Sequence, residues 1–321
     1  MGELNENAAP TNEVPLVVAV VGPTAVGKSA LALALASSFK GEIVSADSRQ
    51  IYKYMDVGTA KPSAAERAAV PHHLVDFVSP DEPYTLADYQ RDAYAAIGGI
   101  ANRGRLPLLV GGTGLYVRAA LGGFAIPHVA PRPELRAQLE HFAAAHGAAA
   151  LHERLRRADP AAAARIDARN VRRVVRALEV YETTGQPISV QQSRAPRPWR
   201  ALTLGLTAER PALYRRIDER VDWQMDHGLV AETERLVASG YSCALPAMSS
   251  LGYRQICMYL RGELTLAEVV TLIKTRTHRF ARQQYTWFRL DDPEIHWFEA
   301  GGGAPERAAE FMRAFLSGCG A

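Results

Sequence analysis

A strand, a glycine-rich loop and a helix follow one another near the start of the chain. Residues 16–21 are all apolar, residues 22–29 read GPTAVGKS, and residues 30–39 are rich in helix formers. The loop matches the pattern GxxxxGK[ST], in which backbone N–H groups and the N-terminus of the following helix bind an anion. The flanking strand and helix favour a phosphate-binding loop (P-loop) over a glycine-rich turn that binds nothing.

Each position of this loop has an expected role. Lys28 should contact terminal phosphate oxygens, and the Ser29 hydroxyl should bind a Mg²⁺ ion. The motif does not identify the phosphorylated compound. The residues expected to surround its phosphate groups are Gly22, Pro23, Thr24, Ala25, Val26, Gly27, Lys28 and Ser29.

The first third of the chain alternates strands and helices. Strands are predicted at 42–45 and 105–110, with a helix over 85–100 between them, and a turn at Pro71 is predicted to lead into a strand over 74–78. This alternation predicts an α/β fold with a parallel sheet and helices on both faces. Ligands of such folds bind beyond the carboxyl ends of the strands.

Composition divides the chain into four parts. Residues 1–13 are polar and acidic and are expected to be a disordered tail, and 14–123 form the first part of the P-loop core. Prolines after Gly123 and an Ala- and Arg-rich helical pattern predict an all-helical insertion domain over 124–199. A proline-rich break at 195–198 precedes 200–321, which continues the core with a strand over 201–206 and C-terminal helices.

Three later helices have recognisable faces. Val171, Val174, Val175 and Leu178 repeat at helical spacing and predict a buried stripe. A second helix is predicted from Pro211 to a stop at Gly240. In the third, Thr265 and Glu268 form a capping box.

The net charge of +3 conceals two basic zones. Residues 151–200 contain eleven arginines and five acidic residues, and 269–290 contain five Lys and Arg residues and no acidic residue. Solvated helices normally mix charges, so these zones and the aromatics among them favour a nucleic-acid partner. The alternative is that they are ordinary solvated or packed helix faces.

Asp47 follows the second strand, at the sheet edge expected to carry the P-loop. A carboxylate there suits a general base or a Mg²⁺ ligand, and the alternative is a helix N-cap. The glycines at 111, 112 and 114 indicate close backbone approach, with Thr113 as the polar contact. His72 and His73 could bind a metal, but no third ligand is evident, so a structural turn is the favoured interpretation.

Several classes of protein are disfavoured. The three cysteines are scattered and form no CxxC pair or zinc pattern, which suits a reducing cytoplasm and argues against a structural metal. No apolar run approaches about 18 residues, so no membrane span is expected. The N-terminus lacks the basic and apolar regions of a secretory signal.

Seven segments together carry a family resemblance. They read, in order, GPTAVGKS, ADSRQIYKYMDVGTAKP, VPHHLVD, LLVGGTGLY, NVRRVVRALE, SSLGYRQI and ARQQYTWFR. In this order they resemble the bacterial tRNA dimethylallyltransferases, the tRNA isopentenyl transferase family. The resemblance extends from about Val14 to Trp297 and is specific, whereas the P-loop alone is shared by many families.

The resemblance implies a transfer reaction rather than nucleotide hydrolysis. The donor would be dimethylallyl diphosphate, and the acceptor N6 of adenosine 37 in tRNAs that read codons beginning with U. The P-loop and Mg²⁺ would then hold the diphosphate, and Asp47 would take the N6 proton. Lys28, Ser29, Thr24 and Arg220 match the other family positions around the reacting groups.

The resemblance also implies a tRNA surface, with the helical insertion gripping the anticodon stem-loop of tRNA. The enzyme is expected to act as a monomer in the cytoplasm. The extra N-terminal tail, the absence of the zinc finger of eukaryotic relatives, and variation at Ser249-Ser250 are departures from the family. The residues expected to contact tRNA are Asp47, Ser48, Arg49, Gln50, Thr113, Arg172, Arg173, Val174, Val175, Arg176, Gly252, Tyr253, Arg254, Arg279, Arg282 and Gln283.

Two other functions fit part of the sequence. A P-loop kinase of a small metabolite would use the insertion as a lid and Asp47 as the base for a hydroxyl. A non-catalytic RNA-binding P-loop protein would not need Asp47.

Overall fold

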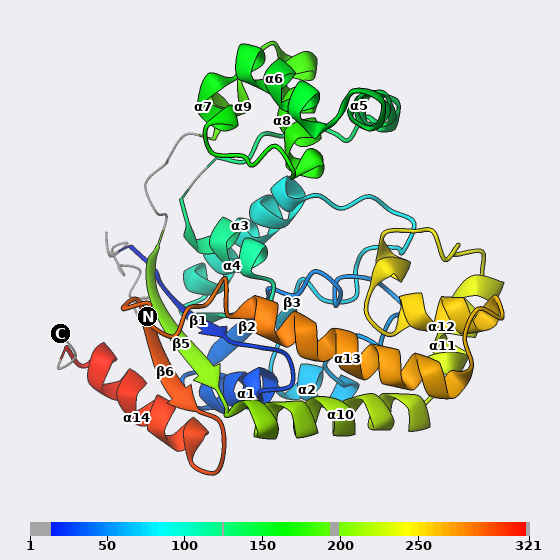
Figure 1. Ribbon diagram of the computed structural model, residues 1–321. Helices are drawn as coiled ribbons and strands as arrows, with labels where there is room; N and C mark the ends of the chain where they lie inside the picture. The colour runs from blue at the N-terminus through cyan, green and yellow to red at the C-terminus, as the bar shows by residue number, and fades with distance from the viewer. Residues whose placement is uncertain (1–13, 124, 193–198, 319–321) are drawn as a thin grey trace, which may run out of the picture. The chain divides into compact units, whose positions relative to one another are not determined.

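In the part of the chain that the structure describes, six parallel strands form one sheet in the order β3-β2-β4-β1-β5-β6 (Figure 1). The computed structural model describes residues 14–123, 125–192 and 199–318, so the predicted tail at 1–13 and the break at 195–198 lie outside the described residues. The strands are β1 (Leu16–Val21), β2 (Gly41–Ser45), β3 (His72–His73), β4 (Leu106–Val110), β5 (Arg200–Thr207) and β6 (Ile295–Glu299).

β1 lies inside the sheet because every one of its side chains is apolar. Val17 to Val21 are fully buried, and Val18 pairs with Leu108 of β4 and Leu202 of β5. A strand of a parallel sheet that is covered on both faces has such a continuous apolar sequence. The prediction of an α/β fold with a parallel sheet is confirmed.

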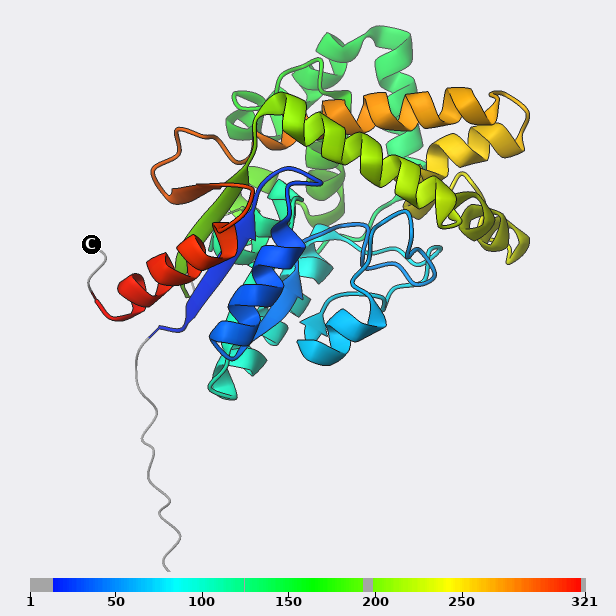
Figure 2. The ribbon, with the colours of Figure 1, turned by 90° about the horizontal axis from the view of Figure 1, so that it is seen from below.

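Helices cover both faces of the sheet (Figures 1 and 2). α1 and α14 lie on one face, where Leu35 and Met312 share a core with β1 and β5. α3 and α4 lie on the other. The helices that alternate with or follow the strands are α1 (Lys28–Ser38), α2 (Ala64–Ala69), α3 (Leu86–Asn102), α4 (Gly114–Leu121), α10 (Arg210–Asp226), α11 (Leu229–Ala238), η1 (Ala247–Ser249), α12 (Tyr253–Leu260), α13 (Leu266–Gln284) and α14 (Ala304–Leu316).

The chain divides into two compact units. Among the described residues, the sheet unit comprises 14–84, 91–121 and 199–318, and the helical unit comprises 85–90, 122–123 and 125–192. The helical unit has its own core, which includes Leu139, Leu151 and Leu178. Its helices are α5 (Pro133–His146), α6 (Ala148–Ala158), α7 (Pro160–Ala163), α8 (Val171–Thr184) and α9 (Ile188–Gln191).

Two predicted elements differ from those observed. The single helix over 211–240 is two helices, α10 and α11, because Gly228 has a φ of 92° and interrupts the helical backbone between them. The strand predicted over 74–78 is replaced by β3 at 72–73. Leu74 and Asp76 have φ values of 60° and 63°, which are incompatible with a strand.

Two of the three cysteines are paired, which differs from the reducing environment that their scattered positions suggested. Cys243 and Cys257 form a disulfide, with their Cα atoms 6.0 Å apart. A turn after α11 and the short helix η1 bring these two residues together, although 14 positions separate them. Sequence spacing alone could not show this return of the chain.

The two adjacent histidines are held by the protein itself. Nδ1 of His72 lies 2.7 Å from the carbonyl of Val70, and Nε2 of His73 lies 2.7 Å from a carboxylate oxygen of Glu42. These contacts fit a structural role of the pair.

Among the helices in the described ranges, none has the length and apolar character of a membrane span.

Candidate active site

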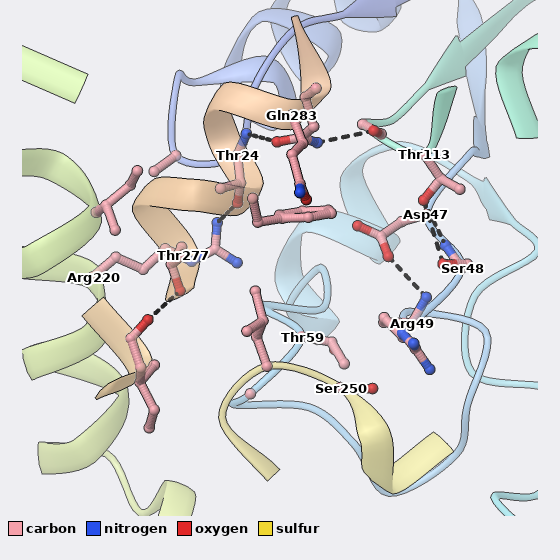
Figure 3. Close-up of a pocket in the computed structure, with 18 of the residues that line it drawn as sticks. Thr24, Asp47, Ser48, Arg49, Thr59, Thr113, Arg220, Ser250, Thr277 and Gln283 are labelled. Atoms are coloured by element: carbon pink, nitrogen blue, oxygen red, sulfur yellow. Dashed lines mark hydrogen bonds between the residues drawn. The ribbon is translucent and has the colours of Figure 1, made fainter. Parts of the chain in front are cut away.

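A cavity of about 460 Å³ lies in the sheet unit, lined by loops from the carboxyl ends of strands and by two long helices. The P-loop and the loops after β2 and β4 meet there, as expected for a parallel sheet. The rest of the lining comes from α10, α13, the segments 58–59 and 249–251, and Trp287. Figure 3 shows Asp47 and Thr113 on one side of the cavity and Arg220 on the other.

The P-loop presents Thr24, Ala25 and Lys28 to the cavity. The Lys28 ammonium donates to the carbonyl of Pro23 at 2.7 Å, within the loop itself. Burial lowers the pKa of Lys28 to about 8; Asp47 opposes this shift, and Arg220 adds to it. Binding of an anion would favour the ammonium form and offset the cost of burial.

Arg220 approaches the P-loop from α10. Its Nη1 lies 3.5 Å from the hydroxyl oxygen of Thr24, and the neighbouring Arg216 donates to the carbonyl of Val26 at 3.3 Å. Burial lowers the pKa of Arg220, and Asp47 acts in the opposite direction. Two cationic groups, Lys28 and Arg220, therefore border the cavity beside the P-loop.

Asp47 lies in a turn after β2 and does not cap a helix. One of its carboxylate oxygens accepts a hydrogen bond from the backbone N–H of Arg49 at 2.8 Å. The adjacent Ser48 N–H donates to the Thr113 hydroxyl at 3.1 Å, which joins the loops after β2 and β4. The alternative reading as a helix N-cap is wrong, and the carboxylate is oriented at the cavity wall.

Gln284, which is not among the predicted site residues, connects the P-loop to the loop after β4. Its side-chain oxygen accepts from Thr24 N–H at 2.8 Å, and its nitrogen donates to the carbonyl of Gly112 at 2.9 Å. A Cβ at position 112 would lie 2.2 Å from that nitrogen, which explains the need for glycine. Gln284 is distinguished from Gln283 only by its burial in the folded chain.

Two aromatic side chains at the end of α13 also line the cavity. Phe280 and Trp287 are 40% and 39% exposed. A Cβ on Gly114 would lie 2.3 Å from the Trp287 ring, so this glycine allows the ring to approach the loop. Exposed aromatic faces beside a cavity can stack on a flat base.

The segment from Ser249 to Arg254 divides between cavity and core. Ser249 and Ser250 line the cavity, and the guanidinium of Arg49 donates to the Pro246 carbonyl at 2.9 Å. Gly252 and Tyr253 are buried, so the prediction that Tyr253 contacts tRNA is corrected. Its hydroxyl donates to the carboxylate of Glu232.

Glu232 supports the cavity from behind. Its carboxylate accepts from the backbone N–H groups of Asp56, Val57 and Gly58 at 3.0, 2.9 and 3.2 Å. The next residues of that segment, Gly58 and Thr59, line the cavity. Tyr253 therefore acts through Glu232 on a cavity loop rather than on a ligand.

Other predicted contacts differ in exposure. Arg254, Arg279 and Arg282 are exposed, and Gln283 is exposed and lines the cavity. Gln50 is turned inward, since its side-chain nitrogen donates to the carbonyl of Ala60 at 3.1 Å. Gln50 thus shapes the loop that contains it.

In the helical unit, only part of the predicted α8 contact surface is exposed. Val174 and Val175 are buried, because they belong to the apolar stripe of α8, and their side chains cannot contact RNA. Arg172 and Arg173 are exposed, whereas Arg176 pairs with the buried Glu179. The arginine spacing in the sequence did not separate these two roles.

Comparisons with known proteins agree with this arrangement. The IPP transferase family matches residues 50–291, and the isopentenyl transferase family matches 15–72. A tRNA dimethylallyltransferase of Roseiflexus sp. (strain RS-1) is 58% identical over 276 residues, which cover 86% of this chain and 90% of the relative.

Solved structures are similar over nearly the whole chain. A tRNA isopentenylpyrophosphate transferase from Bacillus halodurans has 39% identity and a TM-score of 0.70, and the match covers 96% of this chain and 97% of that one. A eukaryotic dimethylallyltransferase described as acting on tRNA has 27% identity and a TM-score of 0.81, covering 95% and 80%. The chain belongs to the IPP transferase family.

Proposed function

We propose that this protein transfers a dimethylallyl group from dimethylallyl diphosphate to N6 of adenosine 37 in tRNAs that read codons beginning with U. The observation that carries the proposal is that a P-loop and Arg220 lie across one cavity from the Asp47 carboxylate. The first pair suits a diphosphate leaving group, and the carboxylate suits removal of a proton from the acceptor.

In the proposed reaction, the bond between C1 and oxygen of the donor breaks and a bond forms between C1 and N6. The N6 proton passes to the Asp47 carboxylate, and diphosphate leaves. Lys28 and Arg220 stabilise the charge that develops on the departing diphosphate. Asp47 is held for this role by the backbone N–H of Arg49 at 2.8 Å.

We propose that Mg²⁺ binds at Ser29, which lies in the first turn of α1 but is not among the residues that line the cavity. Among residues 14–123, 125–192 and 199–318, no group of three or more His, Cys, Asp or Glu side chains could hold a metal. The Ser29 hydroxyl, exposed in the first turn of α1, would bind the ion together with diphosphate oxygens and water, an arrangement typical of Mg²⁺. When bound, the ion would neutralise charge on the diphosphate.

Adenosine 37 must leave the base stack of the anticodon loop to reach Asp47. Phe280 and Trp287 offer exposed rings for stacking beside the cavity. Arg279 and Arg282 on α13, and Arg172 and Arg173 on α8, supply exposed cations for the tRNA backbone. We propose, as the family resemblance implies, that the protein acts as a monomer, and its tRNA substrate implies a cytoplasmic location.

The test is transfer of label from dimethylallyl diphosphate to unmodified tRNA containing A36-A37-A38, in the presence of Mg²⁺. A matched transcript with guanosine at position 37 lacks the N6 amine and should remain unlabelled. Absence of label in the first tRNA would sink the proposal. Phosphorylation of a small metabolite by ATP, without transfer to tRNA, would favour a kinase, and tRNA binding without either reaction would favour a non-catalytic RNA-binding protein.

A further inference from the structure

One wall of the cavity is apolar and is built from two packed helices. Ile217 and Val221 lie one turn apart on α10, and Ile273 lies on α13, which packs against α10. All three line the cavity, although they are only 1%, 2% and 2% exposed. They form the boundary between the cavity and the core behind it.

The hydroxyl and amide groups beside this wall donate their hydrogen bonds to backbone carbonyls of the protein. The Thr277 hydroxyl donates to the carbonyl of Ile273 at 2.7 Å, and the Thr59 hydroxyl donates to Met55 at 2.6 Å. The side-chain nitrogen of Gln224 donates to the carbonyls of Val57 and Gly58 at 2.8 and 3.1 Å. An alkyl group against this wall would therefore leave these donors satisfied.

The side chains of this wall are closely packed from behind and have little space into which to move. Val221 and Ile273 belong to a core that also contains Tyr253, which is fully buried. A Cβ added to Gly58, which lines the cavity, would lie 2.4 Å from the Tyr253 ring. Because protein cores are close-packed, the size of the wall side chains sets the depth of the cavity here.

The same turn of α10 carries the charged side chain that faces the P-loop. Arg220 lies three residues after Ile217 and directly before Val221, and its guanidinium reaches toward Thr24. A diphosphate between Arg220 and the P-loop would thus leave the attached alkyl chain close to Ile217 and Val221. Polar and apolar parts of one donor would contact neighbouring positions of one helix.

We propose that Ile217, Val221 and Ile273 set the length of the alkyl chain that the enzyme accepts, limiting it to the five carbons of a dimethylallyl group. This inference rests on the proposed function, because it assumes a prenyl diphosphate donor. A ten-carbon geranyl chain adds five carbons, which would have to displace these core side chains.

The experiment compares kcat/KM for dimethylallyl diphosphate and geranyl diphosphate with the same tRNA, and identifies the modified adenosine by mass spectrometry. For Ile217→Ala and Ile273→Ala, the ratio of geranyl to dimethylallyl transfer should rise at least about tenfold over the unsubstituted enzyme. Ile273→Val removes less volume, keeps the core better filled, and should shift the ratio in the same direction by a smaller factor.

Matched controls lie one helical turn earlier on the same helices. Leu213 and Val269 are 3% and 0% exposed and do not line the cavity. Leu213→Ala and Val269→Ala also lose core packing, yet they should leave the ratio within about twofold of its original value.

An unchanged ratio in all three cavity variants would overturn the inference, as would equal use of both donors by the unsubstituted enzyme. If Ile217→Ala or Ile273→Ala fails to fold by circular dichroism, Ile273→Val decides. A complete lack of dimethylallyl transfer by the unsubstituted enzyme would instead refute the proposed function.

Discussion

The sheet unit and the helical unit each contain a buried glutamate, but the two carboxylates have different partners. Glu232 in the sheet unit accepts from three backbone N–H groups and the Tyr253 hydroxyl, and thereby shapes a loop of the cavity. Glu179 in the helical unit accepts from Arg136 and Arg176 and from the Arg132 N–H.

The difference shows that a buried carboxylate holds a cavity loop in the sheet unit and joins helices of the core in the helical unit. Burial alone raises the pKa of Glu179, but hydrogen bonds from Arg136, the Arg132 N–H and Arg176 outweigh it and keep that pKa below its usual value. One of the arginines that hold Glu179, Arg176, lies in a zone (residues 151–200) whose charge pattern favoured a nucleic-acid partner. Charge pattern alone therefore does not separate arginines that hold the fold from arginines that are free to contact a partner.

The largest expected effect is that of a substitution at Asp47, which should remove the reaction in the sheet unit without disturbing the fold. Asp47→Asn keeps an oxygen that can accept from Arg49 N–H but cannot take up the N6 proton. Transfer should fall by about 10²- to 10⁴-fold, while tRNA binding and thermal unfolding stay nearly unchanged. Single-turnover transfer and filter binding measure the two properties, and lost tRNA binding would assign Asp47 to recognition.

The second prediction concerns the buried glutamate of the helical unit. Glu179→Ala leaves Arg136 and Arg176 without their shared carboxylate and should lower the free energy of unfolding by about 3 kcal/mol. The loss should not be larger, because both arginines are about one-third exposed and water can partly solvate them. Urea unfolding at pH 7 measures this loss.

The pH dependence of this stability difference tests the role of the Glu179 carboxylate in a second way. Because the folded-state pKa of Glu179 is lowered, its contribution is present above its unfolded value near about 4.3 and is lost as pH falls through the lower folded value. The difference between the original protein and Glu179→Ala should thus shrink in acid. A constant difference down to the lowest pH at which both fold would contradict this account.

The third prediction tests whether the buried amide of Gln284 holds loops of the cavity in place by hydrogen bonds, as the Glu232 carboxylate does. Gln284→Leu removes both hydrogen bonds that join the P-loop to Gly112, and kcat/KM for transfer should fall by about 30-fold. Gln284→Glu retains an acceptor for Thr24 N–H but loses the donor for Gly112. A smaller loss in the Leu variant than in Gln283→Leu would show that the bridge is unimportant.

The smallest effect concerns the charge at the P-loop. Since the pKa of Lys28 is about 8, the ammonium form predominates below pH 8 and is lost as pH rises through that value. KM for the donor should then rise toward about tenfold per pH unit above 8. Lys28→Arg stays protonated over this range and should give a flatter profile, so an identical rise in both proteins would exclude Lys28 as the cause.

Much of the sheet unit was predictable because its signals are local. The apolar run of β1, the P-loop and the capping box at Thr265 each depend on residues close in sequence. The break between α10 and α11 was missed, since a strong apolar row continues toward Met225 and only the backbone at Gly228 interrupts it.

The site was predictable where one residue has one chemical role. Asp47, Lys28 and Arg220 all line the cavity. Tyr253, Val174 and Val175 were misassigned because a motif or helical repeat does not show which of its members face the core. Gln284 was missed because its two partners are 260 and 172 residues away along the chain.

The sequence by itself determined the parallel sheet, the phosphate-binding loop and the family, because these depend on short ordered segments and their spacing. Only the tertiary structure decided which polar groups hold loops, which face the cavity, and that Cys243 and Cys257 join. The physical reason is that burial and hydrogen-bond partners arise from contacts between distant segments, and the same residue type serves either role according to what surrounds it.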